Sequence, residues 1–236
     1  MDLREFIKKY DLLKIEKIVS KSKSYKRLYK IRVKSILHNV AEEFVEFVRE
    51  LPNWKLEIFE DVFNFGKKIC IDCRLGLEDI EVMFNDILPN YVRGGLIGCF
   101  ISGLYHNILG DGDVLRLNLY KYSGSISGLG YMHKKGKLIV YGNRAFCLGY
   151  KMRGGIIEVF GNVGNYLGKQ MEGGEIIVHG NARNWVGEKM KGGRIVIKGN
   201  AGDIIGYKME GGEIVIKGKV GSWVGEDLRG GRILFE

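Results

Sequence analysis

Apolar and polar positions recur with one fixed spacing along residues 142–236. Adjacent glycine pairs stand at 154–155, 173–174, 192–193, 211–212 and 230–231, each pair 19 residues after the one before. Two apolar residues separated by one position follow each pair, as Ile176 and Val178 do. Alternation at period two is typical of a β-strand with one buried face. We therefore predict one short strand per unit, with both apolar side chains facing the interior.

A period of this length indicates a solenoid. Helical repeats need more than about thirty residues, whereas one short strand with tight turns fits a shorter unit. The predicted fold class is mainly β: a single-stranded parallel β-helix of 19-residue coils, right-handed as parallel crossovers nearly always are. Imperfect units, marked by glycines such as Gly103 and Gly110, extend the pattern back to residue 92. Counting them, we expect roughly eight coils.

Charged positions provide a check on this register. Residues one period apart should lie above one another at the spacing of paired strands, about 4.8 Å. Two columns alternate in sign from unit to unit: Arg153, Glu172, Lys191, Glu210 and Arg229, and Glu175, Arg194, Glu213 and Arg232. Opposite charges in stacked positions attract each other, so we assign these residues to structure and not to ligand binding.

Residues 1–91 show few glycines and no trace of the period. Apolar residues at helical spacing predict amphipathic helices over 40–51 and 77–88, each followed by a proline. The remaining elements expected are a short opening helix and strands at 13–19, 28–33, 55–59 and 68–73. This order is that of a small α+β, ferredoxin-like domain. The chain is thus predicted to divide into an α+β domain (1–91) and a glycine-array β-helix (92–236).

Composition narrows the choice of partners and compartment. The chain has 236 residues, 35 glycines, two prolines and a net charge of +9. It has no apolar run long enough for a membrane span, and charged residues follow Met1 closely, so we expect a cytoplasmic protein with no membrane partner. The basic segment 21–27 is accompanied by no nucleic-acid-binding motif. Nucleic acid is therefore not expected as a partner.

Candidate chemical motifs do not assemble into a site. Cys70 and Cys73 form a C-x-x-C, but in the predicted strand they would point to opposite faces, so we interpret them as buried thiols. The four histidines lack metal-ligand spacing and are expected at the surface. The glycine-rich segment 123–130 lacks the lysine of a phosphate-binding loop and is interpreted as a turn of an imperfect coil. We name no catalytic, cofactor-binding or metal-ligating residue, and no cofactor.

Two outward-facing columns are not explained by the coil itself. Between the interior positions lies an apolar stripe of Ile177, Val196, Val215 and Leu234, which implies a cover: the N-terminal domain, a second copy or a foreign subunit. The other column, Tyr166, Trp185, Ile204 and Trp223, offers aromatic anchors for a partner or packs on a neighbouring loop. The last strand is likewise expected to pair with a partner or another copy. The candidate partner-interface residues are Ile177, Val196, Val215, Leu234, Trp185 and Trp223.

The repeat resembles a known family. Its motif is M-x-G-G-x-I-x-V-x-G-N, as in Met171–Asn181. This motif is similar to the glycine-array (GXGXG) β-helix of two enzymes, formylmethanofuran dehydrogenase, where it forms part of one subunit, and glutamate synthase, where it forms the C-terminal domain of the large subunit. The motif is closer to that of formylmethanofuran dehydrogenase. In both enzymes this domain is non-catalytic and bridges subunits that carry metal, pterin or flavin chemistry. The resemblance implies a scaffold or accessory subunit of an oxidoreductase complex of the formylmethanofuran dehydrogenase type.

Two alternatives to this scaffold remain open. One is a stand-alone glycine-array subunit of the glutamate synthase type. The other belongs to a different class, an independent small-ligand-binding protein that uses the cleft between the two predicted domains. That alternative needs a convergent acid, base or nucleophile if it is to be an enzyme, and the sequence offers none.

Overall fold

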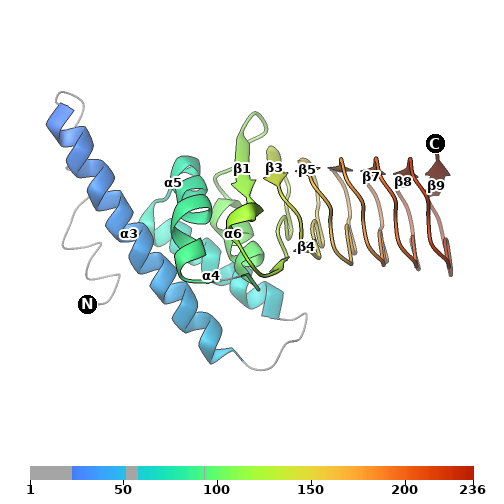
Figure 1. Cartoon of the computed structure of the whole chain (residues 1–236), viewed down its shortest axis with the longest axis horizontal. Helices are drawn as coiled ribbons and strands as arrows, with labels where there is room; N and C mark the ends of the chain where they lie inside the picture. Colours follow the sequence, from blue (N-terminus) through green and yellow to red (C-terminus); the bar gives the residue numbers. More distant parts are fainter. Residues whose placement is uncertain (1–22, 52–57, 93) are drawn as a thin grey trace.

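The structure, a computed structural model, describes residues 23–51, 58–92 and 94–236. A group of helices is followed by strands that stack one after another along the long axis of the molecule (Figure 1). The helical elements are α3 (Lys23–Glu50), α4 (Ile58–Cys73), α5 (Leu77–Val82), the π-helical turn η1 (Met83–Ile87), the 3-10 turn η2 (Leu88–Asn90), α6 (Ile97–Tyr105) and, among the strands, the 3-10 turn η3 (Leu119–Lys121).

The strands form a parallel β-helix of about six turns, which confirms the solenoid prediction with fewer coils than the roughly eight expected. The main sheet is in chain order: β1 (Val114–Asn118), β3 (Lys137–Tyr141), β5 (Ile156–Phe160), β6 (Glu175–Val178), β7 (Arg194–Ile197), β8 (Glu213–Ile216) and β9 (Arg232–Phe235). A second wall begins with β2 (Ile126–Ser127) paired to β4 (Ala145–Phe146). Single parallel bridges continue this wall through Val163, Ala182 and Ala201.

Ion pairs between neighbouring coils confirm the predicted register. Arg194 lies 3.2 Å from Glu175 in the preceding coil and 2.9 Å from Glu213 in the next. The same contact recurs between Arg153 and Glu172, Glu210 and Arg229, and Glu213 and Arg232. Such partly exposed pairs each contribute about 0–1 kcal/mol. Their main effect is to favour one alignment of the strands over its neighbours.

The interior of the coil is filled by the residues that the period predicts. Ile176, Val178 and their equivalents in the neighbouring coils are fully buried, and Met152, Met171, Met190 and Met209 form a second buried column beside them. The glycine pairs mark corners where stacked backbones nearly touch. At Gly174, where φ is +87°, an added Cβ would lie 2.8 Å from the carbonyl oxygen of Gly155. Glycine is needed there for both conformation and space.

The N-terminal part differs from the α+β prediction. Residues 28–33 lie within α3 and residues 68–73 within α4, so these two predicted strands are wrong, and every regular element described before residue 106 is helical. The helices predicted over 40–51 and 77–88 are present in α3 and in the α5–η1–η2 run. The opening helix, the 13–19 strand and most of the 55–59 strand lie outside the described residues. The ferredoxin-like arrangement is not confirmed.

The helices close the first end of the β-helix. Residues 97–105, expected to be part of an imperfect coil, form α6 instead, which packs on the coil that contains β2. The buried hydroxyl of Ser102 lies 2.7 Å from the Gly98 carbonyl oxygen of α6 and 3.2 Å from the Gly128 carbonyl oxygen of the coil, and it accepts from Gly130 N–H at 2.9 Å. On the outer edge of β1, the Arg116 and Asn118 N–H groups donate to Glu81 and Asn85 at 2.6 and 2.8 Å. Side chains thereby satisfy an edge that would otherwise be free to pair.

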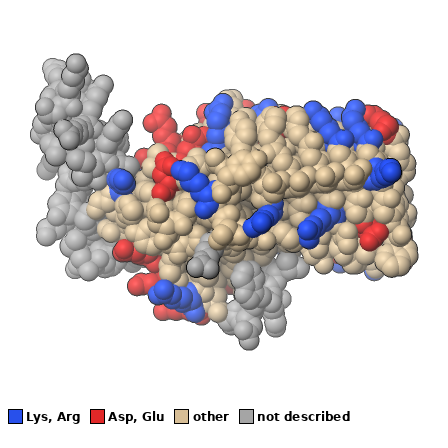
Figure 2. All heavy atoms as spheres, in the orientation of Figure 1, with Lys and Arg blue, Asp and Glu red and all other residues tan. Residues whose placement is uncertain are grey.

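The surface divides in character along the molecule. In the view of Figure 2, acidic side chains gather over the helical part, while scattered basic side chains predominate on the β-helix. No helix within the described ranges is long and apolar enough to cross a membrane.

His133 should make folding stability depend on pH. It is fully buried, contrary to the expected surface position, and its Nε2 lies 3.3 Å from the Gly136 carbonyl oxygen. Burial lowers the pKa of His133 to about 4 from the usual value near 6.5. The neutral ring is favoured in the folded state, so this stability is present above pH 6.5 and is lost as the pH falls toward 4.

We expect a loss of up to about 3 kcal/mol from His133 between pH 7 and pH 4. Urea unfolding at a series of pH values measures it, and His133→Gln should flatten the slope between pH 6.5 and 4. Part of the slope should remain, because His106 also has a pKa lowered to about 4 by burial. An unchanged slope in the variant would show that His133 is not the titrating group.

Candidate functional site

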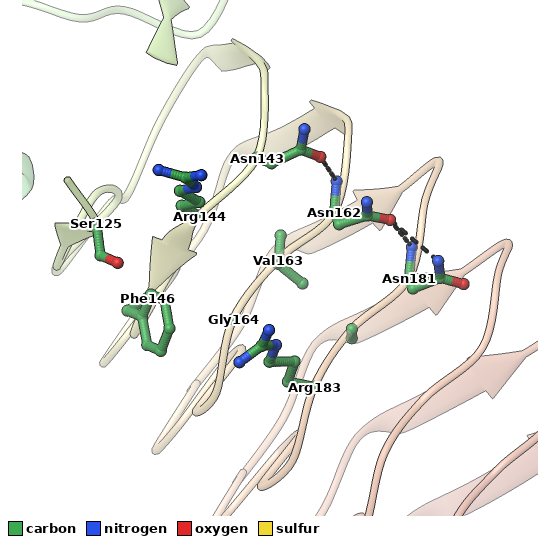
Figure 3. Close-up of a pocket in the computed structure, with 10 residues that line it drawn as sticks. Ser125, Asn143, Arg144, Phe146, Asn162, Val163, Gly164, Asn181 and Arg183 are labelled. Carbon is green, nitrogen blue, oxygen red and sulfur yellow. Dashed lines mark hydrogen bonds between the residues drawn. The ribbon is translucent and has the colours of Figure 1, made fainter. Parts of the chain in front are cut away.

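A depression of about 490 Å³ lies on the side of the β-helix, where the second wall begins (Figure 3). Its lining comes from β4 and the turns of three successive coils together with the residue before β2. The lining residues are Ser125, Asn143, Arg144, Phe146, Asn162, Val163, Gly164, Asn181, Ala182 and Arg183. They include two arginines and no carboxylate. Its volume lies within the usual range for small-molecule sites, about 300–1,000 Å³.

A local change of register creates this depression. On the second wall Ala145 pairs with Val163, a step of 18 residues, whereas Val163, Ala182 and Ala201 follow at steps of 19. The step is shorter because Arg144 is inserted between Asn143 and Ala145, whereas Val163 follows Asn162 directly in the next coil. Arg144 adopts a left-handed conformation, with φ of +73°. The Phe146 ring then lies over Gly164, where an added Cβ would come within 2.7 Å of the ring. The departure from the repeat places an arginine and an aromatic ring side by side.

An asparagine ladder forms one rim of the depression. Asn143 Oδ1 accepts a hydrogen bond from Asn162 N–H, and Asn162 Oδ1 accepts one from Asn181 N–H, both at 2.8 Å. Because a backbone N–H can only donate, these contacts fix which amide atom is the oxygen. The oxygens of Asn143 and Asn162 are thus engaged, whereas their Nδ2 groups keep donor capacity.

The two arginines of the depression differ from the other arginines of residues 142–236. Residues 142–236 contain six: Arg144, Arg153, Arg183, Arg194, Arg229 and Arg232. The four outside the depression form ion pairs with glutamates of neighbouring coils. Arg144 instead donates to the Ser123 carbonyl at 2.7 Å. The Arg183 guanidinium makes no hydrogen bond or ion pair with any residue that the structure describes, although the backbone N–H of Arg183 donates to the Val163 carbonyl at 3.2 Å. Positive charge is therefore left uncompensated here.

The predicted apolar stripe is largely buried within the chain itself. Its members pair in register across β6 to β9, and Val196 and Val215 are only 8% and 1% exposed. Neighbouring strands, not the helical part, flank them. Ile177 is half-buried and Leu234 is 39% exposed. Val196 and Val215 consequently offer little surface to a partner, whereas Leu234 does.

The aromatic column, defined as Tyr166, Trp185, Ile204 and Trp223, stands at one corner of successive coils. All four residues have positive φ, between 55° and 65°. The Tyr166 and Trp185 rings stack at 5.8 Å, and the edge of Trp185 meets Tyr207 at 5.6 Å. Trp185 is half-buried in these contacts, whereas Trp223 is 64% exposed. Packing between coils therefore explains part of the column and leaves Trp223 accessible.

A buried ion pair lies beside the aromatic column. Lys169 Nζ is 2.8 Å from Glu188 and 4.8 Å from the centre of the Tyr166 ring. Cys147, one coil before Tyr166, lies close to both charges. Burial raises the pKa of the Cys147 thiol to about 11, although Lys169 opposes the shift. Cys147 is therefore a protonated thiol at neutral pH and a poor nucleophile.

Cys70 and Cys73 are buried as expected, but for a different reason. They lie three residues apart on α4, hence on one face of a helix and not on opposite faces of a strand. Burial is the main cause that raises the pKa of Cys70 to about 11 and that of Cys73 to about 12. Protonated thiols are weak metal ligands. Within the described residues, no three His, Cys, Asp or Glu side chains are placed to hold a metal ion.

The depression does not emerge from the sequence interpretation, although a signal for it exists. In the coils after Phe146, the corresponding outward positions of the second wall are Gly164, Arg183, Gly202 and Gly221. An arginine among glycines, next to a coil that carries Phe and Arg, marks the place where the repeat is broken.

No protein-family model and no curated protein matches this chain.

Proposed function

We propose that this protein is a non-catalytic accessory subunit that binds a partner through its aromatic column. The observation that carries the proposal is the conformation of Tyr166, Trp185, Ile204 and Trp223. Left-handed backbone is costly for bulky residues, by roughly 1–2 kcal/mol each, and costs glycine or asparagine far less. The coil needs the turn but not the large side chains. Packing between coils accounts for part of this repetition, and a role at the surface would account for the exposed Trp223.

The chemistry of this surface indicates the partner. Rigid aromatic side chains are the residues that most often anchor protein interfaces. Lysines accompany them: Lys208 lies 4.9 Å from the centre of the Tyr207 ring and 4.0 Å from Asp227, and Lys189, which lies between Trp185 and Ile204 in the sequence, is exposed. A complementary partner therefore has an apolar pocket for Trp223 and an acidic rim. The class of complex, an oxidoreductase of the formylmethanofuran dehydrogenase type, is proposed from the likeness of the glycine repeat alone.

Purification from the native cell tests this proposal. Tagged protein should retain a subunit that carries metal, pterin or flavin, in a fixed molar ratio. The double variant Trp185→Ala/Trp223→Ala should recover at least about tenfold less of that subunit, because interface tryptophans commonly contribute 2 kcal/mol or more. Tyr120→Ala is the matched control, since Tyr120 is 68% exposed and lies outside the column. Its recovery should equal that of the parent.

Three results would contradict the proposal. The first is a monomer or homo-oligomer without a cofactor-bearing companion. The second is an equal loss of the companion subunit in the control and in the double variant. The third is that only the double variant loses the companion and circular dichroism shows this variant to be unfolded, because the loss then reflects folding and not the surface. A companion with flavin but no pterin would favour the glutamate synthase type of assembly instead. In that case the surface is retained and the class of complex is replaced.

A small-ligand-binding role is a second candidate, and the depression beside Arg144 and Arg183 favours it. Its place differs from the inter-domain cleft that the sequence suggests for such a ligand. The two roles use different residues of the β-helix and do not exclude each other.

A further inference from the structure

We infer that the depression between Arg144 and Arg183 is a binding site for a small anion that bears a phosphate or carboxylate group on a flat, apolar body. This site is independent of the aromatic column and of the accessory role proposed above. It rests on the uncompensated charge, on the donors of the rim and on the place where the repeat is broken.

The electrostatics of the depression select an anion. Arginine presents up to five N–H donors in a planar fork that matches the oxygens of phosphate and carboxylate. The four arginines of residues 142–236 that lie outside the depression each meet a glutamate. Arg183 has no such neighbour among the described residues, and the lining contains no acid that could take this place. An anion bound here would give Arg144 and Arg183 the counter-charge that the other four arginines of residues 142–236 already have.

The rim adds hydrogen-bond donors, which favour an anion as the arginines do. With the Oδ1 atoms of Asn143 and Asn162 held by backbone N–H groups, the unengaged polar groups of these two side chains are their Nδ2 donors. The Ser125 hydroxyl lies on the opposite side of the depression, near Arg144 (Figure 3). A lining made of donors and cations disfavours cations and suits an acceptor-rich ligand.

Phe146 supplies an apolar surface for the rest of the ligand. Its ring is half-exposed and rests on the backbone at Gly164, which has no side chain to cover it. Val163 and Ala182 form the floor. Stacking of a planar group on an aromatic ring contributes roughly 1–3 kcal/mol. The expected ligand therefore combines an anionic head for the arginines with a flat group for Phe146.

The residues that build the site are the ones that depart from the repeat. Arg144 is an additional residue between Asn143 and Ala145, since Val163 follows Asn162 directly in the next coil. Phe146 stands where the next coil has Gly164, and Arg183 stands between Gly164 and Gly202 in the same column. The fold is satisfied by small residues at these positions in the other coils. Departures from a regular pattern that cluster at one place indicate function more than structure.

Calorimetric titration of the full chain tests the inference with three probes. Adenosine monophosphate and benzoate carry a phosphate and a carboxylate on a flat body, and inorganic phosphate lacks the flat body. We expect at least one flat probe to bind with a Kd between about 10 μM and 1 mM, and inorganic phosphate to bind at least tenfold more weakly. Which flat probe binds better distinguishes a phosphate site from a carboxylate site.

Variants locate the binding. Arg183→Gln and Arg144→Gln should each weaken the flat probe about tenfold or more, since hydrogen bonds between charged groups contribute about 1.5–3 kcal/mol. Phe146→Ala should weaken the flat probe and leave inorganic phosphate unchanged. The control Arg194→Gln, at an arginine that is already ion-paired, should change Kd less than twofold. The Kd should also rise with added sodium chloride.

The inference is overturned if none of the three probes binds below 10 mM, or if Arg194→Gln weakens binding as much as Arg183→Gln does. Binding that is insensitive to salt would also overturn it. Because the aromatic column is untouched by these variants, recovery of a partner subunit should be unchanged in Arg183→Gln. A failure of one proposal is thereby separated from a failure of the other.

Discussion

Gly103→Ala should destabilise the protein by about 3 kcal/mol and lower its melting temperature by about 6–12 °C. Gly103 of α6 lies directly against α4, where an added Cβ would overlap the Phe63 carbonyl oxygen and lie 3.0 Å from Lys67 N. The contact is reciprocal, since a Cβ at Gly66 of α4 would meet the backbone of Phe100 and Leu104. A rigid backbone cannot move aside as a side chain can. The two helices would have to separate.

The gain in helix propensity, about 1 kcal/mol for alanine over glycine, offsets only part of this strain. Gly112→Ala is the control, because a Cβ at Gly112 would meet no atom within 4 Å. It should leave the melting temperature unchanged or slightly raised. Thermal unfolding followed by circular dichroism compares the two. Equal melting temperatures for Gly103→Ala and the parent would show that α4 and α6 are not in close contact.

Val215→Asp should destabilise the isolated chain by about 3 kcal/mol or more at pH 7, even without a partner. Val215 is 1% exposed between Val196 and Leu234, so the new carboxylate would lose most of its water. Nearby cations cannot readily compensate, because Arg232 is already paired with Glu213, and Lys217 with Glu236. The effect tests whether the apolar stripe belongs to the fold or to an interface.

The pH dependence of this effect has a definite sign. Burial raises the pKa of the introduced Asp above its unfolded value of about 3.9, so the neutral form is favoured in the folded state. The difference in unfolding free energy from the parent should be smallest below pH 4 and grow as the pH rises through the raised pKa. Comparison at equal pH removes the contribution of His133.

Leu234→Asp is the matched control in the same stripe, at a residue that is 39% exposed. We expect it to cost less than about 1 kcal/mol. Denaturant unfolding of the purified variants measures both values. If Val215→Asp folds as well as Leu234→Asp and only loses a partner, then the stripe is an interface, as the sequence pattern alone suggests, and not part of the fold.

The β-helix can be predicted because its information is local and repeated. The alternating charges of Glu175, Arg194 and Glu213 are enough to indicate the strand register. Each apolar interior position also recurs in the next coil, which gives the same prediction again. The helical part offers one copy of each signal. In α4, the buried residues Val62, Gly66, Ile69 and Cys73 follow helical spacing, but only if Gly66 is counted with the apolar face. Glycine disfavours helices, so the sequence pattern favours a strand there.

The reason for Gly66 lies in another element. It faces Gly103, and each residue lacks a side chain because of the other. A sequence pattern cannot reveal this pairing, and spacing alone places Gly103 in the glycine array. The candidate site escapes sequence reasoning for a related reason. Arg144, Phe146 and Arg183 are separated along the chain and are brought together only by the 18-residue step, which the regular glycine pairs conceal.

The alternating charges between coils make the effective unit of this solenoid a pair of coils. A single coil is complete in its glycines and interior residues, yet its outer charge is opposite to that of the next. Loss of the one coil that contains Arg194 would bring Glu175 against Glu213, two like charges at strand spacing. Loss of two coils would restore attraction. Such a solenoid is therefore most easily lengthened or shortened by two coils at a time, which changes its length by about 10 Å.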